Sequence, residues 1–302
     1  MALHVVLAGG SGFLGSHLRT ELLDRGHRVT SLVRRAAGES ESRWDPAAGT
    51  VDRDLVGSAD VVVNLAGSPT LGNPHSKKWA RELRESRVST TRVLAEAVAA
   101  APHPPAYLAG NAVGWYGDHG DAVLDETADT RGHTLMTSVC RDWQAATTSA
   151  TEAGGRVCLL RTAPVMDGSN APLRQLRLLF LAGLGGRVGS GRQWMPMVSL
   201  RDWVGAVAFL AEHPSASGPV NISAPRPATN QDLTKTLAAA VRRPALIPVP
   251  APLVKVAAGP ISPEALGSVR VVPAALLQLG YEFSDPGVAD IVATGLGQRV
   301  RS

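Results

Sequence analysis

Three glycines near the start of the chain have the spacing of a loop that approaches a phosphate. Gly9, Gly12 and Gly15 form a G-x-x-G-x-x-G pattern between an apolar run at 3–8 and a helical pattern at 16–25. The first glycine of such a loop permits a tight turn, the second admits a pyrophosphate, and the third lets the helix pack on the strand. The N–H groups that open the helix then face the phosphates. The alternative is a glycine-rich turn without a ligand. The pattern favours a dinucleotide loop with contacts from Gly9, Ser11, Gly12, Phe13, Leu14 and Gly15.

Two arginines follow the next β-rich run, at the place where the cofactor ribose would lie. An NAD-binding loop usually carries an acidic residue there, which accepts the ribose 2′-hydroxyl. This chain has Arg34 and Arg35 instead. Guanidinium groups suit a 2′-phosphate, which they bind in bidentate fashion. The alternative is a pair of solvated surface arginines. The sequence therefore favours NADP(H) over NAD(H).

Strand-like and helical patterns alternate around this loop. Strands are expected at 3–8, 28–33, 60–65, 106–109 and 157–161, and helices at 16–25, 79–100 and 139–153. This alternation predicts an α/β fold, a Rossmann-type doubly wound parallel sheet. The runs at 61–63 and 157–160 are apolar at every position, as expected for strands covered on both faces.

After Arg161 the pattern changes, and glycines crowd residues 181–198. We interpret 1–165 as the dinucleotide-binding domain and 166–302 as a smaller α+β substrate lobe. A run at 219–222 looks like one more strand that returns to the sheet.

Composition excludes several other classes of protein. The 302 residues carry a formal net charge of +4, without a dense basic run that would bind nucleic acid. The two cysteines, Cys140 and Cys158, make neither a disulfide framework nor a metal-ligand spacing. Apolar stretches fall short of the roughly 18 residues of a membrane span, and the N-terminus lacks a signal-peptide pattern. We expect a cytoplasmic protein that binds a small molecule, without a metal.

Further motifs match one family in combination. They are GGSGFLG at 9–15, NLAG at 64–67, SRV at 86–88, AVGWYG at 112–117, VCRDW at 139–143, LRT at 160–162, GSGRQW at 189–194, NISAP at 221–225, residues 248–249 and GYEF at 280–283, with Arg34 and Trp79. Over its full length the chain resembles the extended short-chain dehydrogenase/reductases. More narrowly, it resembles their atypical NAD-dependent epimerase/dehydratase-like (sugar-nucleotide epimerase-like) branch. The resemblance implies NADP(H) between a Rossmann domain and a substrate lobe, cofactor contacts from Leu65, Ala66 and Gly67, and a monomer or homodimer.

The catalytic positions depart from that superfamily. Typical members use Tyr-x-x-x-Lys on one helix and Ser or Thr at the end of the fourth strand. Alignment places Met136 at the Tyr position, Cys140 at the Lys position and Asn111 at the Ser position. Methionine donates no proton and cysteine supplies no fixed positive charge. We expect Met136 to contact the substrate and Cys140 the cofactor, with Cys140 a small apolar filler rather than a nucleophile.

Three other residues are candidates for catalysis. Asn111 would hold a substrate carbonyl or a water, Tyr116 would donate a proton, and His133 would act as a general acid or base. Each has a structural alternative: a strand-end amide, a packing tyrosine and a surface histidine. On the substrate side we expect Trp115, Met136, Arg192, Gln193 and Trp194. Arg192 would bind a phosphate, carboxylate or phenolate, or else stabilise its own loop.

The favoured hypothesis is an NADP(H)-dependent oxidoreductase or epimerase-like enzyme acting on a small carbonyl or hydroxyl substrate. Its active site would be non-standard, because the Tyr-Lys pair is missing. One alternative is an NADP(H)-binding sensor or scaffold without redox turnover. Another is a lyase, cyclase or isomerase that uses the same cleft without redox chemistry.

Overall fold

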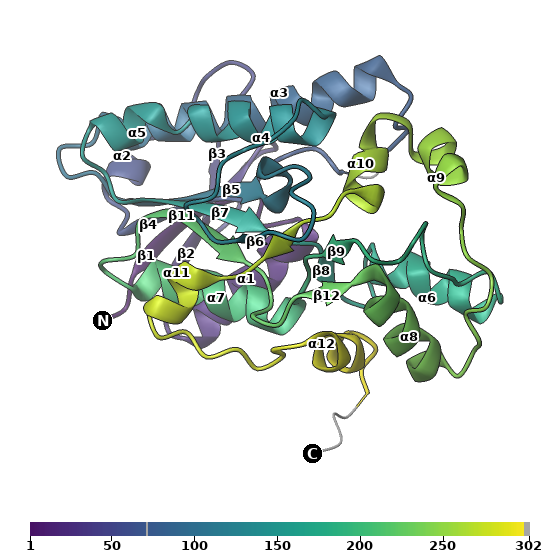
Figure 1. Cartoon of the computed structure of the whole chain (residues 1–302). Coiled ribbons are helices and arrows are strands. Elements are labelled where there is room, and N and C mark those ends of the chain that lie inside the picture. Colours follow the sequence, from purple (N-terminus) through teal and green to yellow (C-terminus); the bar gives the residue numbers. More distant parts are fainter. Residues whose placement is uncertain (71, 299–302) are drawn as a thin grey trace. The chain divides into compact units, whose positions relative to one another are not determined.

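The computed structural model describes residues 1–70 and 72–298 and contains a seven-stranded sheet (Figure 1). Its order is β11-β7-β5-β4-β1-β2-β3. The bounds are β1 His4–Ala8, β2 Arg28–Val33, β3 Glu41–Arg43, β4 Val61–Asn64, β5 Ala106–Ala112, β7 Val157–Thr162 and β11 Gly218–Ile222. β1 pairs in parallel with β2 and β4, and β4 pairs in parallel with β5. The predicted Rossmann-type α/β fold is confirmed.

Two compact units divide the chain. The first comprises Met1–Asn111, Val139–Leu160 and Val204–Val220, and the second comprises Ala112–Ser138, Arg161–Trp203 and the described residues from Asn221 onward. The limits 1–165 and 166–302 stay a prediction, because compact packing does not establish which segments fold independently. Residues 299–302 of that range lie outside the described residues.

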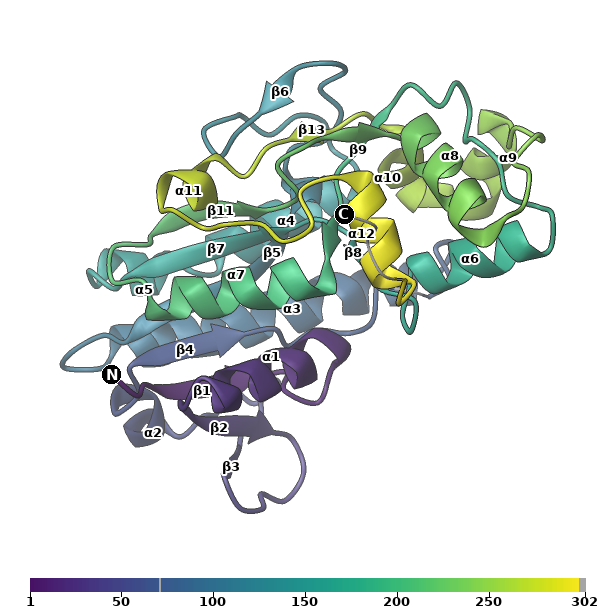
Figure 2. The same cartoon turned by 90° about the horizontal axis from the view of Figure 1, so that it is seen from below.

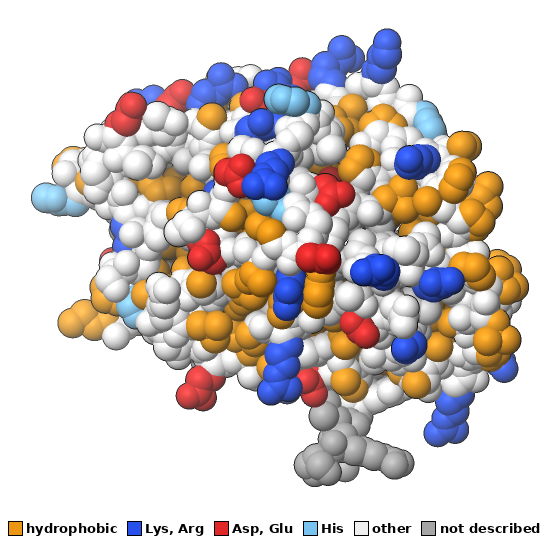
Figure 3. Space-filling model, viewed as in Figure 1, with side chains coloured by type: hydrophobic (Ala, Val, Ile, Leu, Met, Phe, Trp, Pro, Cys, Tyr) orange, Lys and Arg blue, Asp and Glu red, His pale blue; other side chains and the backbone are white. Residues whose placement is uncertain are grey.

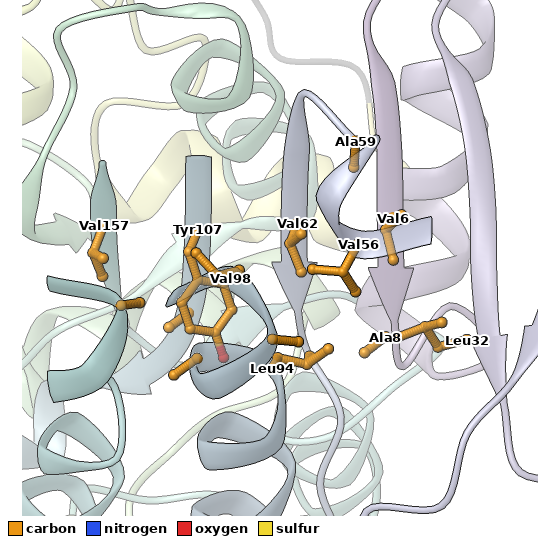
Figure 4. Close-up of a cluster of buried hydrophobic side chains, with 14 of the residues drawn as sticks. Val6, Ala8, Leu32, Val56, Ala59, Val62, Leu94, Val98, Tyr107 and Val157 are labelled. Atoms are coloured by element: carbon orange, nitrogen blue, oxygen red, sulfur yellow. The ribbon is translucent and has the colours of Figure 1, made fainter. Parts of the chain in front are cut away.

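Helices cover both faces of the sheet in the first unit. Their bounds are α1 Phe13–Asp24, α2 Arg53–Gly57, α3 Lys77–Ala99, α4 Leu135–Ala145, α5 Thr148–Glu152 and α7 Leu200–Glu212. The first residues of α4 and α7 belong to the second unit. Figures 1 and 2 show α3 and α5 on one face and α1 and α7 on the other. Leu94 and Val98 point from α3 towards Val62 and Tyr107 of the sheet (Figure 4). Burial on both faces explains why β4 is apolar at three consecutive positions.

Short strands and helices make up the second unit. They are η1 Val113–Trp115, β6 Val123–Leu124, β8 Val165–Met166, α6 Leu173–Leu181, β9 Trp194–Met195, β10 Val198–Ser199, β12 Ala228–Thr229, α8 Asn230–Val241, α9 Ala251–Ala258, η2 Gly259–Ile261, α10 Ser262–Leu266, β13 Arg270–Val271, α11 Ala274–Gln278 and α12 Val288–Gly295. β13 pairs with β6, which ties the segment after β5 to the C-terminal part of the chain. Leu173, Phe180, Leu237 and Ile291 pack in a core of this unit.

Apolar side chains are also exposed on the second unit. They gather among Lys and Arg side chains where α6, α8 and α9 lie (Figure 3). They include Leu178, Leu179, Leu181, Leu184, Leu246, Ile247, Leu253 and Val256. No helix within the described residues has both the length and the apolar character to cross a membrane.

Candidate functional site

The glycine loop lies between β1 and α1, and each glycine that the pattern singled out is in close contact with backbone. Gly9 has a φ of +85°, and a Cβ there would lie 2.7 Å from the backbone carbon of Leu65. The N–H of Gly12 donates to the carbonyl oxygen of Gly9 at 3.0 Å. A Cβ on Gly15 would overlap that same carbonyl oxygen. Side chains are therefore excluded from Gly9 and Gly15 by geometry, and α1 starts as close to β1 as backbone atoms allow.

The start of α1 suits an anion. Gly12 precedes the helix and, within the described residues, no side chain caps it. The first N–H groups of a helix lack intrahelical partners and carry a partial positive charge. Ser11 and Gly12 are exposed, whereas Phe13 and Leu14 are half-buried. The loop thus presents backbone donors at an accessible surface, as a pyrophosphate requires.

The loop after β4 borders the glycine loop and is held by buried side chains, among them Asn64. Asn64 ends β4, and its Oδ1 accepts from the N–H of Ala66 at 3.1 Å. Its Nδ2 donates to Thr91 Oγ1 of α3 at 2.9 Å. The N–H of Leu65 donates to the carbonyl oxygen of Ala8. These bonds hold Leu65 and Ala66 beside Gly9, and Gly67 follows them in the same loop.

Arg34 and Arg35 after β2 differ in their surroundings, although both are expected from sequence to contact the 2′-phosphate. Arg35 forms a bidentate pair with Glu41, with both N–O distances at 2.7 Å. Arg34 is exposed, and no carboxylate of the described residues lies within ion-pair distance of it. Arg34 therefore has its guanidinium available for a phosphate, while Arg35 is engaged by its own loop.

Two of the altered catalytic positions meet in the first unit. Asn111 lies near the end of β5 and Cys140 lies in α4, and both are buried. The Asn111 Nδ2 donates to the carbonyl oxygen of Cys140 at 3.2 Å. One function of Asn111 is thus to join β5 to α4. The role of its amide in catalysis stays a prediction.

Tyr116 belongs to the second unit and is fully buried. Its hydroxyl lies 2.7 Å from Asn221 Oδ1 and 3.0 Å from the carbonyl oxygen of Asp125. Arg161 Nη1 donates to the same hydroxyl at 3.0 Å, and its guanidinium lies over the rings of Trp115 and Tyr116. Burial raises the pKa of Tyr116. These contacts favour a structural role, while proton donation by Tyr116 stays a prediction.

Replacing Tyr116 with phenylalanine is expected to lower the free energy of unfolding by about 1–3 kcal/mol. The reason is that the buried side chains of Arg161 and Asn221 would each lose a hydrogen bond to the Tyr116 hydroxyl. Urea denaturation followed by tryptophan fluorescence measures this change. Tyr281→Phe is the control, since its half-buried hydroxyl donates to the Asp202 carbonyl oxygen, and a smaller loss is expected. Unchanged stability with lost turnover would instead identify Tyr116 as a proton donor.

The remaining candidates also lie in the second unit. Gln193 is buried, and its Nε2 donates to the carbonyl oxygens of Val188 and Ala265. Trp194 Nε1 donates to Asp121 at 3.0 Å. Both side chains hold loops of their own unit. His133 and Arg192 are exposed, and Met136 is buried at the start of α4.

Comparison with known proteins decides the family. A family model described as the NAD dependent epimerase/dehydratase family matches residues 5–223. The chain belongs to this family. A further model, a domain of unknown function (DUF1731), matches residues 249–294. The resemblance to an atypical extended short-chain dehydrogenase/reductase is thereby confirmed.

Relatives of this epimerase-family chain cover nearly its full length. Epimerase family protein Mb2239 of Mycobacterium bovis is 40% identical over 281 residues, which are 92% of this chain and 93% of the relative. Human epimerase family protein SDR39U1 is 33% identical, over 94% of this chain and 96% of the relative. The crystal structure of human SDR39U1 (isoform 2) with NADPH matches with a TM-score of 0.87 and 30% identity, covering 97% of this chain and 98% of that one.

In this member of the epimerase family, α4 carries the positions that the family resemblance assigns to tyrosine and lysine. Residues Leu135–Ala145 read LMTSVCRDWQA, without tyrosine or lysine. No pattern in the sequence indicates the network around α4. Trp143 Nε1 donates to Thr91 Oγ1 at 2.8 Å, and the Arg87 guanidinium lies over the Trp143 ring. Trp143 and Arg87 each belong to a family motif, but their spacing in the sequence does not predict that they meet.

Proposed function

We propose that this epimerase-family protein binds NADP(H) and uses it in redox chemistry on a small carbonyl or hydroxyl substrate. The observation that carries the proposal is the combination of the glycine loop after β1 with the exposed Arg34 after β2. Gly9 and Gly15 leave only enough room for backbone, and Arg34 follows β2 without a carboxylate among its described neighbours. The presence of NADPH in the human SDR39U1 structure supports the same cofactor.

The residues of the first unit divide the binding of the dinucleotide among them. The backbone N–H groups at the start of α1 would bind the pyrophosphate, and Arg34 would bind the 2′-phosphate. Leu65, Ala66, Gly67 and Cys140 would border the rest of the cofactor. When bound, NADP(H) supplies or accepts a hydride. Asn111 would orient a substrate oxygen or a water.

A redox role is expected to show as a change of nicotinamide absorbance during turnover. The full-length protein is mixed with NADPH or NADP⁺ and a panel of carbonyl compounds, alcohols and sugar nucleotides. Asn111→Ala is expected to lower kcat without loss of NADPH affinity, because its amide would act on the substrate. Tight NADPH binding without turnover of any compound would favour the sensor or scaffold function. The absence of tyrosine and lysine from α4 is the observation that supports this second candidate. Turnover at constant absorbance would favour a lyase, cyclase or isomerase.

A further inference from the structure

Arg87 is a buried cation in α3, at the edge of the sheet where β4 ends. Arg87 is only 8% exposed to solvent. Nη1 donates to the carbonyl oxygen of Leu83 at 3.0 Å, and Nη2 donates to Thr70 Oγ1 at 3.1 Å. The guanidinium lies 5.2 Å from the centroid of the Trp143 ring. All of these partners are neutral.

No carboxylate among residues 1–70 and 72–298 lies within ion-pair distance of Arg87. Burial lowers the pKa of its guanidinium, and the Cys140 thiol acts in the opposite direction. Arginine nevertheless stays protonated in proteins, so the charge is retained. A buried charge is costly unless an opposite charge compensates it. The hydrogen bonds to Leu83 and Thr70 use two of the five N–H groups of the side chain, which leaves donors for an anion.

Packing of α3 against α4 does not depend on this charge. Trp143 of α4 is held by its own hydrogen bond to Thr91 of α3. Thr91 also accepts from Asn64, whose Nδ2 lies 3.4 Å from the Tyr107 hydroxyl. An exposed pair, Arg84 and Asp142, joins the same two helices one turn earlier. A neutral side chain at position 87 would therefore leave these contacts in place.

The loop after β4 separates Arg87 from the glycine loop. Its Leu65 backbone contacts Gly9, whereas a Cβ on Gly67 would lie 3.3 Å from Arg87 Cγ. Under the proposed function, the cofactor phosphates are already assigned to the start of α1 and to Arg34. The nicotinamide ribose half of NADPH carries no further negative charge. An anion that meets Arg87 must then belong to the other reactant.

We propose that Arg87 binds an anionic group, a carboxylate or a phosphate, of the substrate at the carboxyl edge of the first unit's sheet. The inference rests on the proposed function, and it assigns the substrate class as an anion. Arg87 is in this view a specificity-determining residue, which selects acids over neutral carbonyl compounds or alcohols. A bidentate bond from its remaining donors would give the strongest contact.

Anion binding to the NADPH-saturated full-length protein tests the proposal. Inorganic phosphate and malonate are titrated separately by calorimetry, which distinguishes a phosphate site from a carboxylate site. Arg87→Gln keeps hydrogen-bond donors but removes the charge, and it is expected to weaken anion binding by at least about tenfold while NADPH affinity stays unchanged. Arg84→Gln is the matched control on the same helix, and it is expected to bind the anion as the unchanged protein does. Arg87→Lys is expected to retain part of the binding.

Three results would overturn the proposal. They are absence of phosphate and malonate binding to the NADPH-bound protein, equal anion affinity with Arg87→Gln, and a parallel loss of NADPH affinity, which would assign Arg87 to the cofactor. Arg87→Met is a second neutral variant, used if the glutamine variant fails to fold. A chain that binds no NADPH before any substitution would instead refute the proposed function itself.

Discussion

Replacing Gly15 with alanine is expected to weaken NADPH binding by about tenfold to a hundredfold. The added Cβ would overlap the Gly9 carbonyl oxygen and lie 2.8 Å from the Gly9 carbonyl carbon. Backbone atoms cannot rotate away from such a contact, so α1 must shift relative to β1. Overpacking of this kind costs about 1–3 kcal/mol of folding stability. The shifted start of α1 would also lose a hydrogen bond to the charged pyrophosphate, and such a bond, at about 1.5–3 kcal/mol, corresponds to roughly tenfold to a hundredfold in affinity. Titration followed by nicotinamide fluorescence measures the loss.

Gly57→Ala is the control for the added methyl group. Gly57 lies in α2 of the same unit, and its Cβ would be 3.6 Å from the Ala101 Cβ, an ordinary contact. NADPH binding of that variant is expected to stay unchanged. Circular dichroism and urea denaturation show whether Gly15→Ala is folded at the temperature of the titration. A folded Gly15→Ala protein with unaltered NADPH affinity would contradict the assignment of the phosphate site.

The parts of the fold predicted from sequence are those in which local pattern and burial agree. The apolar runs at 61–63 and 157–160 form β4 and β7, because both faces of those strands are covered.

The helix expected at 139–153 is instead two helices, α4 and α5. Thr147 lies between them, and its Oγ1 donates to the carbonyl oxygen of Gln144. Hydroxyl bonds of this type compete with a continuous helix. β3, with the sequence ESR, is not predicted from sequence, because an edge strand of polar residues has no apolar alternation.

The candidate site was predicted only where its chemistry is local in the sequence. The glycine loop is such a case, because its backbone shape is set within seven residues, while its binding of a pyrophosphate stays a proposal. The Tyr116 cluster is not, since its partners Arg161 and Asn221 are 45 and 105 residues away along the chain. Arg87 likewise meets α4 and the loop after β4 only through the fold. Spacing in one sequence carries no information on such contacts, which depend on strand order.

Replacing Arg34 with alanine is expected to remove the preference for NADPH over NADH. A charge-assisted hydrogen bond contributes about 1.5–3 kcal/mol, so NADPH affinity should fall by about tenfold to a hundredfold. NADH affinity should change little, because NADH has no 2′-phosphate. Parallel titrations with both nucleotides measure the ratio. Added salt should lower the NADPH affinity of the unchanged protein more than that of Arg34→Ala, since the exposed guanidinium is screened.

Arg35→Ala is the matched control, because the two arginines are neighbours with the same charge. The Arg35 side chain is already engaged by Glu41, so its removal should leave the nucleotide preference unchanged. The opposite result, with preference lost in Arg35→Ala and kept in Arg34→Ala, would mean that Arg35 exchanges Glu41 for the phosphate. Equal affinity of the unchanged protein for NADPH and NADH would contradict the assignment of either arginine to a 2′-phosphate. The two alanine variants thus separate a charge that is merely close to the site from one that is available to bind the nucleotide.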